Sequence, residues 1–200
     1  ISVAATIATI GLGTLSAYGL KLFVSRLGER ISNFLLLGKL VPSITILIPL
    51  FVMLNRVRLT GTYVGPILAH SAMSLPFVTW LMASFVRDIP SEILESARVE
   101  GATRMKTFYK VIFPMLTPAI ASAVVLVMQA SWNELMFSIQ LTNIYTYPLT
   151  AGIARYVQEV SVDWGKSSVA ATIAMVPIIA IGFLAQRYLV TGITAGAVKS

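Results

Sequence analysis

Apolar residues run along this chain in five long stretches, separated by segments that hold most of the charged and turn-forming residues. Each stretch has about the length that a helix needs to cross a hydrocarbon core, which takes roughly 20 residues. We therefore predict five membrane-spanning helices, at Ile1 to about Val24, Asn33 to about Leu54, Val64 to about Val86, Met115 to about Leu141, and Ser167 to about Val190.

The basic residues predict the orientation of these spans. Eleven of the fifteen Lys and Arg residues lie in the first connection, the third connection and the C-terminal tail. Because positively charged loops stay on the cytoplasmic side, we expect the third connection and the C-terminus in the cytoplasm. The chain starts at Ile1 rather than at a methionine. We therefore expect a further helix upstream.

The composition supports a membrane protein and excludes several chemistries. Hydrophobic residues make up 56% of the chain, charged residues 12%, and the mean hydropathy is +0.83, whereas a soluble domain carries roughly 25% charged residues. The chain has no cysteine and a single histidine, His70, which excludes disulfides, thiol catalysis and a histidine-built metal site. The net charge of +7 is dispersed between apolar runs. It does not form the stripe that nucleic-acid binding needs.

The third connection, residues 87–113, has the strongest local signals. Pro90 and Ser91 predict a helix start, and Glu92 lies in the first turn, where the helix dipole favours acids. Gly101 predicts the end of this short helix. A second helix is expected from about Thr103 into the next span, with apolar positions at Met105, Phe108, Tyr109 and Ile112.

Two interpretations of the short helix remain open from its residues alone. A surface helix with small residues on one face fits a groove in a partner protein. An amphipathic helix lying on the lipid headgroups would have a similar pattern.

The same segment resembles the EAA motif of ABC importer permeases, which has the form E-A-A, three residues, G, nine residues, I-x-L-P. Here the matching residues are Glu95-Ser96-Ala97, Gly101 and Val111-Ile112-Phe113-Pro114, and the spacing fits throughout. Ser96, Val111 and Phe113 depart from the consensus. Glu100-Gly101-Ala102 stands where the sugar branch usually has Asp-Gly-Ala.

This resemblance implies that residues 87–113 contain the coupling helix, which docks into a cleft of the cytoplasmic ATPase. The residues it assigns to coupling are Glu92, Glu95, Ser96, Ala97, Glu100, Gly101, Ala102 and Pro114.

Two further stretches resemble the oligosaccharide branch of the same family. Trp132-Asn133-Glu134 occurs in the corresponding span of many sugar permeases, and the tail from Gln186 to Lys199 resembles the C-terminus of maltose-type inner-membrane subunits. In that family the tail, here residues 187–200, lies against the ATPase pair. The residues implied in this contact are Thr194, Gly196 and Lys199. The family's complete subunits usually have six spans.

Glu134 is the one acid within an apolar stretch, which makes it a candidate functional residue because a charge is costly to place in lipid. With Gln129, Trp132 and Asn133 it forms a polar cluster beside an aromatic ring, the chemistry that binds sugars. The alternative is a hydrogen-bond network that packs helices together. For His70 a packed, hydrogen-bonded role is the more common one.

Taken together, the residues and the resemblance predict an all-α polytopic bundle of the type I ABC importer permease fold, with residues 1–200 as one domain. The resemblance implies a second related permease, two cytoplasmic ATPase subunits, an extracytoplasmic solute-binding protein, and a sugar substrate in a bacterial or archaeal cytoplasmic membrane. Gly165-Lys166-Ser167 lacks the upstream glycine of a phosphate-binding loop, since position 160 is valine. We expect no enzymatic activity or bound cofactor in this subunit, with ATP and Mg²⁺ on the partner ATPase. The alternatives are a secondary transporter and an ABC permease for a non-sugar solute.

Overall fold

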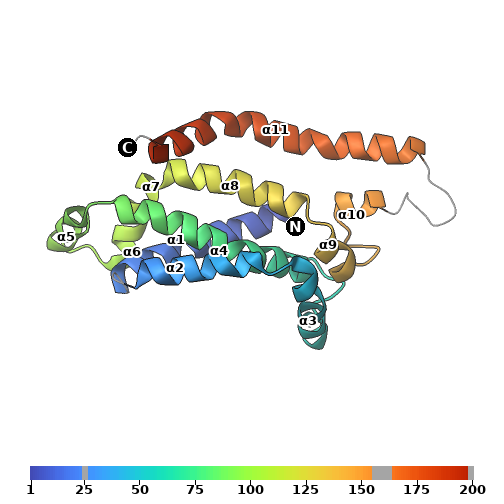
Figure 1. Cartoon of the computed structure of the whole chain (residues 1–200), viewed down its shortest axis with the longest axis horizontal. Helices are drawn as coiled ribbons and strands as arrows, with labels where there is room; N and C mark the ends of the chain where they lie inside the picture. Colours follow the sequence, from blue (N-terminus) through green and yellow to red (C-terminus); the bar gives the residue numbers. More distant parts are fainter. Residues whose placement is uncertain (24–26, 155–163, 198–200) are drawn as a thin grey trace. The chain divides into compact units, whose positions relative to one another are not determined.

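The computed structural model describes residues 1–23, 27–154 and 164–197, with only the backbone described for residue 29 and for 184–197. These ranges contain helices and connections and no strand. The first half of the chain forms α1 (Ser2–Phe23), α2 (Gly28–Leu37), the 3₁₀ helix η1 (Gly38–Leu40), α3 (Ser43–Arg56) and α4 (Val64–Asp88). The second half forms α5 (Ser91–Val99), α6 (Arg104–Thr107), the π-helix η2 (Phe108–Ile112), α7 (Phe113–Met115), α8 (Thr117–Trp132), α9 (Met136–Leu141), α10 (Leu149–Ile153) and α11 (Trp164–Ala197) (Figure 1). The predicted all-α class is confirmed.

Three of the predicted spans are single long helices. Ser2–Phe23, Val64–Asp88 and the Trp164–Phe183 part of α11 are each long and apolar enough to cross a membrane. The predicted second and fourth spans are instead helix pairs, Arg30–Leu40 with Ser43–Arg56 and Arg104–Met115 with Thr117–Trp132. The described residues therefore supply three spans, or up to five if each pair counts as one.

Proline explains both breaks. Pro42 is the N-cap of α3, and Pro118 follows the first residue of α8. Neither residue has an amide hydrogen to donate to the carbonyl four residues earlier, so a regular helix cannot run through them without losing a hydrogen bond. The second pair is bent by 77° at its break.

The chain folds into two compact units. Unit 1 comprises Ile1–Thr6, Val41–Met73 and Val125–Gln186, and unit 2 comprises Ile7–Leu40, Ser74–Val124 and Arg187–Ser200. Helices α1, α4, α8 and α11 contribute residues to both units.

The core of unit 1 lies where α3 packs on the start of α4 and on α9. Its buried members are Leu54, Ala69, Phe137 and Leu141. Four apolar residues of α3 point to this core at helical spacing, Leu47, Leu50, Phe51 and Leu54. The other face of α3 exposes large apolar side chains, Ile44, Ile48, Val52 and Met53. A helix that is apolar all round is typical of a membrane setting.

The core of unit 2 forms where α1 packs closely on α4. A Cβ atom on Gly13 would lie 2.6 Å from Cγ1 of Val78, so the missing side chain lets the two helices approach. Small residues at such contacts are typical of membrane helices. Tyr18 of α1 and Met82 and Val86 of α4 are buried in the same core.

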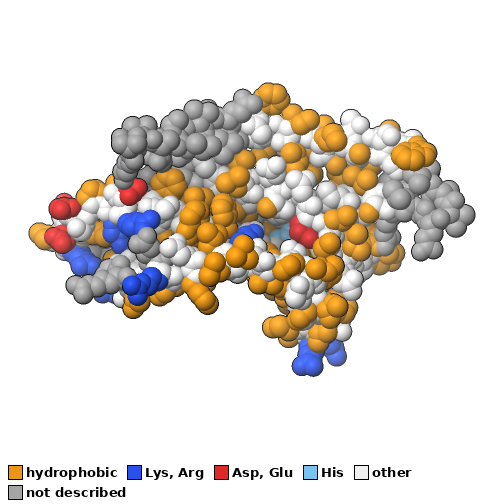
Figure 2. Space-filling model, in the orientation of Figure 1, with side chains coloured by type: hydrophobic (Ala, Val, Ile, Leu, Met, Phe, Trp, Pro, Cys, Tyr) orange, Lys and Arg blue, Asp and Glu red, His pale blue; other side chains and the backbone are white. Residues whose placement is uncertain are grey.

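Apolar and charged side chains gather on different parts of the surface. Apolar side chains cover much of the visible face in Figure 2, whereas charged side chains of unit 2 gather around α5 and α6. Large exposed apolar patches of this kind mark a surface that contacts lipid or another protein rather than water.

Candidate functional site

The coupling segment predicted from the sequence forms a short exposed helix in unit 2. Leu94 and Ala97 are the buried residues of α5, and they hold the helix to the rest of the unit. Its opposite face presents Glu92, Ser96 and Val99, the last of which is 89% exposed. These positions are three or four residues apart and so lie on one side of the helix.

An open groove of about 360 Å³ runs along the same helix. It is lined by four of the residues predicted for coupling, Glu92, Ser96, Ala97 and Glu100, together with Ile93 and Val111. Ala97 is buried and Ala102 half-buried. These two small residues therefore let α5 pack closely on its own chain.

Gly101 ends α5 in the way that the sequence predicts, and the structure supplies the reason. Its φ of +76° lies in the left-handed region, which glycine adopts without a steric penalty. This turn lets the amide of Ala102 donate to the carbonyl of Ala97 and the amide of Gly101 donate to the carbonyl of Arg98, each over 2.9 Å. The pair of bonds is a Schellman motif, which satisfies carbonyls that a helix end leaves free. The spacing between Ala97 and Gly101 in the motif thus follows from how the helix ends.

The helix expected after Thr103 is present but irregular. Thr103 caps α6 by accepting a hydrogen bond from the amide of Lys106 over 3.3 Å. The chain then continues as the π-helix η2, in which the amide of Phe113 donates to the carbonyl of Phe108. Of the four apolar positions named from the sequence, Phe108 and Ile112 are buried.

The other two apolar side chains of this stretch lie at the surface. Met105 and Tyr109 are exposed. The wider turn of the π-helix carries an extra residue within each hydrogen-bonded ring.

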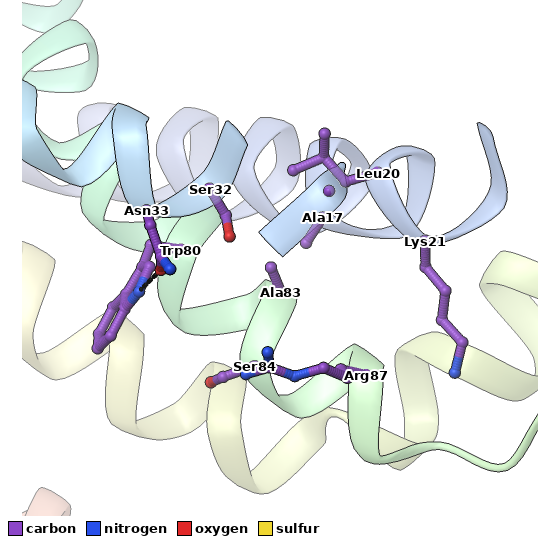
Figure 3. Close-up of a pocket in the computed structure, with 10 residues that line it drawn as sticks. Ala17, Leu20, Lys21, Ser32, Asn33, Trp80, Ala83, Ser84 and Arg87 are labelled. Carbon is purple, nitrogen blue, oxygen red and sulfur yellow. Dashed lines mark hydrogen bonds between the residues drawn. The ribbon is translucent and has the colours of Figure 1, made fainter. Parts of the chain in front are cut away.

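A cavity of about 340 Å³ lies beside α1, α2 and α4 in unit 2. Figure 3 shows Lys21, Ser32, Asn33, Trp80 and Arg87 among the residues that line it. The indole nitrogen of Trp80 donates to Oδ1 of Asn33 over 3.0 Å, which ties α4 to α2.

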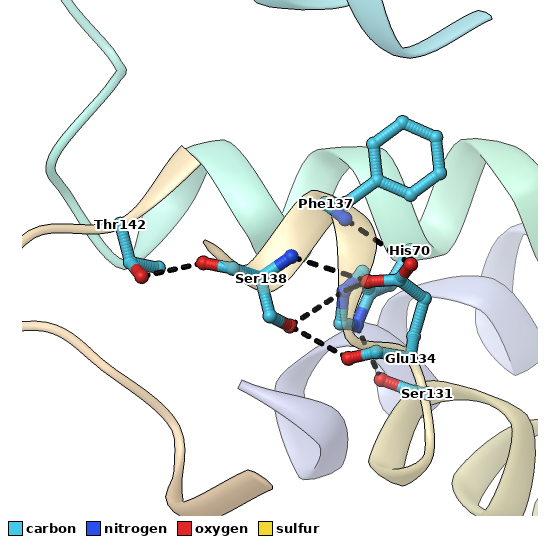
Figure 4. A network of polar contacts seen from close by, with 6 residues as sticks. All are labelled: His70, Ser131, Glu134, Phe137, Ser138 and Thr142. Carbon is cyan, nitrogen blue, oxygen red and sulfur yellow. Dashed lines mark hydrogen bonds and ion pairs between the residues drawn. The ribbon is translucent and has the colours of Figure 1, made fainter. Parts of the chain in front are cut away.

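The polar residues predicted around Glu134 are only partly brought together. Glu134 lies in the break between α8 and α9, where its carboxylate accepts from the amides of Phe137 (3.1 Å) and Ser138 (3.2 Å). An acidic side chain in this position caps the start of a helix. Its Oε2 also lies 3.2 Å from Nε2 of His70 in α4 (Figure 4).

His70 is a buried member of this network in unit 1. The side chain is 3% exposed, and its Nδ1 lies 2.6 Å from the hydroxyl of Ser131. His70 is therefore packed and hydrogen-bonded, as expected, and it joins α4 to the end of α8 and the start of α9. The sequence offered no signal for the pairing with Glu134, because the two residues are far apart along the chain.

The other members of the predicted cluster differ in their exposure. Gln129 and Asn133 are exposed. Trp132 lines a cavity of about 240 Å³ in unit 1, together with His70, Ser131 and Tyr147. Trp132 is thus the one predicted pathway residue that shares a cavity with the polar network.

The predicted ATPase-contacting tail is described only in part. The backbone of α11 stays helical to Ala197, so Thr194 and Gly196 lie in its last turns. Lys199 lies outside the described residues.

The long apolar helices and the exposed apolar surface define a polytopic membrane protein. Residues 9–195 match the family described as "Binding-protein-dependent transport system inner membrane component", and the chain belongs to this family. It is therefore a permease subunit of an ABC importer, a transport component that works with an ATPase and a substrate-binding protein.

Relatives and solved structures agree with this assignment. The chain is 34% identical over 203 residues to the osmoprotective compounds uptake permease GgtD of Synechocystis, covering all of this chain and 68% of the relative. It is 30% identical to the trehalose/maltose permease MalG of Thermococcus litoralis, covering 97% of this chain and 70% of the relative. An importer of the acidic polysaccharide alginate has a similar fold, with a TM-score of 0.73 and 20% identity over 94% of this chain and 71% of that one. The MetNI methionine transporter follows with a TM-score of 0.60 and 17% identity over 95% of each chain.

Proposed function

We propose that this permease forms half of the passage for a sugar or oligosaccharide, paired with a second related permease. Relatives named as permeases for trehalose/maltose, trehalose, and melibiose/raffinose/stachyose are 29–31% identical to almost the whole chain. A non-sugar solute is the alternative, and the relative named for osmoprotective compounds is the observation that favours it.

We also propose that residues 87–113 face the cytoplasm and transmit closure of the ATPase pair to the spans. The observation that carries this proposal is α5 itself, a helix with two buried residues, an exposed face, and an end fixed by the turn at Gly101. An exposed valine within a charged segment suits a protein groove better than water. In this arrangement Ala97, Gly101 and Ala102 shape the helix, and the exposed residues make the contact.

For the passage itself, Trp132 is the pathway residue best supported by its place in a cavity. An indole ring beside hydroxyl groups is the chemistry that stacks on and hydrogen-bonds to a sugar. Gln129 and Asn133 present exposed amides from the same region of the chain. Glu134 contributes indirectly, by capping α9 and binding His70.

The remaining parts of the proposal concern topology and partners. The C-terminus lies in the cytoplasm, where the tail from 187 to 200 contacts the ATPase. ATP and Mg²⁺ bind to that partner, and this subunit performs no covalent chemistry. A solute-binding protein delivers the sugar to the outer face, and nucleotide binding then drives alternating access.

Cysteine crosslinking tests the coupling role, and the chain has no native cysteine to interfere. Cysteines at the exposed Ser96 or Val99 should crosslink to the co-expressed ATPase, and the yield should change when ATP is added. A cysteine at the buried Leu94 is the matched control and should not react. If neither exposed position crosslinks in an assembled complex, the coupling role is wrong.

Uptake into proteoliposomes tests the substrate class. The complete complex should accumulate radiolabelled maltose, trehalose or melibiose when ATP is inside. Excess unlabelled methionine should not compete. ATP-dependent uptake of a radiolabelled non-sugar solute, without uptake of any sugar, would favour the alternative.

A further inference from the structure

Helix α1 places two polar side chains against the chain on either side of the coupling helix α5. Tyr18 and Lys21 are three residues apart in α1 and so lie on the same face of the helix. Both belong to unit 2, as does the segment from Pro90 to Thr103. Helices α4 and α6 are joined to that segment by the chain, whereas α1 reaches it only through non-covalent contacts.

Lys21 binds the end of α4 just before the coupling helix begins. Its ammonium donates to the carbonyl of Val86 over 2.9 Å and also to the carbonyl of Ile89. In a regular helix the carbonyl of Val86 would accept from the amide of residue 90, which is Pro90 and has no hydrogen to donate. The amide of Ile89 donates to this carbonyl over 3.3 Å, and Lys21 adds a shorter, charged donor. A positive charge at a helix C-terminus is favourable.

Tyr18 binds the chain just after the coupling helix ends. Its hydroxyl donates to the carbonyl of Arg104, the first residue of α6, over 3.2 Å. The side chain is 3% exposed, and its ring lies 5.3 Å from that of Phe108. The guanidinium of Arg104 also lies 4.7 Å above the ring of Phe23, which adds a cation–π contact from the same end of α1.

We propose that Tyr18 and Lys21 are positioning residues that make α1 move together with the coupling segment. They hold the chain at Ile89 and at Arg104, so both flanks of α5 are fixed to one helix. A displacement of α5 by the ATPase is then passed to α1 through these bonds, in addition to the covalent route into α6 and α8. This inference rests on the proposed coupling role and adds the helix that receives the movement.

A distance measurement within the assembled transporter tests the inference without needing the substrate. Spin labels are placed on cysteines at Leu12 in α1 and Arg98 in α5, which are both exposed; Arg98 lies away from the face that presents Ser96 and Val99. With Tyr18 and Lys21 intact, adding ATP should change the distance between the labels by less than about 2 Å, the scale of small helix shifts. In the Tyr18→Phe, Lys21→Met double variant the distance should change by more than this or its distribution should broaden.

Matched variants separate the two bonds from a general loss of structure. Lys21→Arg keeps a cationic donor and should behave as the parent chain does. The control pair Tyr145→Phe and Lys39→Met makes the same chemical changes at exposed side chains and should also have no effect. The single Tyr18→Phe variant, which keeps the ring, serves if the double variant does not assemble.

Two outcomes overturn the inference. One is an ATP-dependent change in the parent chain as large as that in the variants, and the other is no change in the variants. The crosslink from Ser96 to the ATPase is measured in parallel, in complexes with the same residues at 18 and 21 and with a cysteine at Ser96 alone. If that crosslink is absent, the coupling role itself is wrong. If it is present and sensitive to ATP while the label distances follow either of these two patterns, only the role of Tyr18 and Lys21 is wrong.

Discussion

Replacing Gly101 with alanine tests whether the left-handed turn holds the end of the coupling helix. With a φ of +76°, an alanine Cβ would crowd the following carbonyl and cost roughly 1–2 kcal/mol. No other atom lies within 4 Å of the position of that Cβ. The whole effect should therefore come from the backbone and none from packing.

The expected change in hydrogen exchange follows from the two hydrogen bonds that depend on the turn. The amides of Gly101 and Ala102 are protected from exchange while they bind Arg98 and Ala97. If the folded turn loses 1–2 kcal/mol, local opening becomes about 5–30 times more frequent, since 1.4 kcal/mol is a factor of ten. Hydrogen exchange of a peptide covering residues 98–103 measures this ratio directly.

Gly11→Ala is the matched control for this experiment. Gly11 lies within α1, where φ is right-handed, and a Cβ there also meets nothing within 4 Å. The same substitution should leave exchange at 98–103 unchanged and should favour helix formation slightly. If Gly101→Ala accelerates exchange by less than about twofold, the turn does not depend on glycine and the reasoning is refuted.

The remaining predictions concern close contacts in each unit. Gly13→Ala should lower the melting temperature of the complex, because overpacking against Val78 costs about 1–3 kcal/mol. Adding Val78→Ala should restore part of the lost stability. An unchanged melting temperature in Gly13→Ala would contradict the close approach of the two helices. Glu134→Ala should lower the stability of the folded chain by about 1–2 kcal/mol, because it removes the cap of α9. Glu134→Gln should lower it less, since the amide keeps one acceptor. Equal losses of stability in the two variants would argue against capping. Gly65→Ala should destabilise unit 1, since its Cβ would lie 2.7 Å from the carbonyl oxygen of Leu59, and unchanged thermal stability would disprove this clash.

Length and hydropathy predicted three of the spans because a continuous apolar run specifies a helix by itself. Hydropathy also located the second and fourth spans, but it did not predict that each is a pair of helices with a break near Pro42 or Pro118. The start of α5 after Pro90 and its end at Gly101 were predictable from local backbone preferences. These signals act within a few residues of where they appear.

Contacts between distant residues were not predictable in this way. In the sequence, Lys21 is one of several basic residues that indicate the topology. Its contact with the end of α4 is visible only in the folded chain. Likewise, nothing in the sequence indicates that His70 and Glu134 are partners. They are the single histidine and the single acid of the apolar stretches. Such pairings depend on which helix faces come together, which periodicity alone does not determine.

The π-helix at Phe108–Ile112 gives this part of the chain a spare residue. A ring closed by a bond to the fifth residue holds one residue more than a ring closed to the fourth. Removing one exposed residue here, such as Lys110, can therefore tighten the turn into a regular helix and leave Ile112 and Leu116 facing the same neighbours. The same deletion inside α8 would turn every later side chain by about 100°. The last part of the coupling segment can thus lose one residue without turning the side chains that follow, whereas α8 cannot.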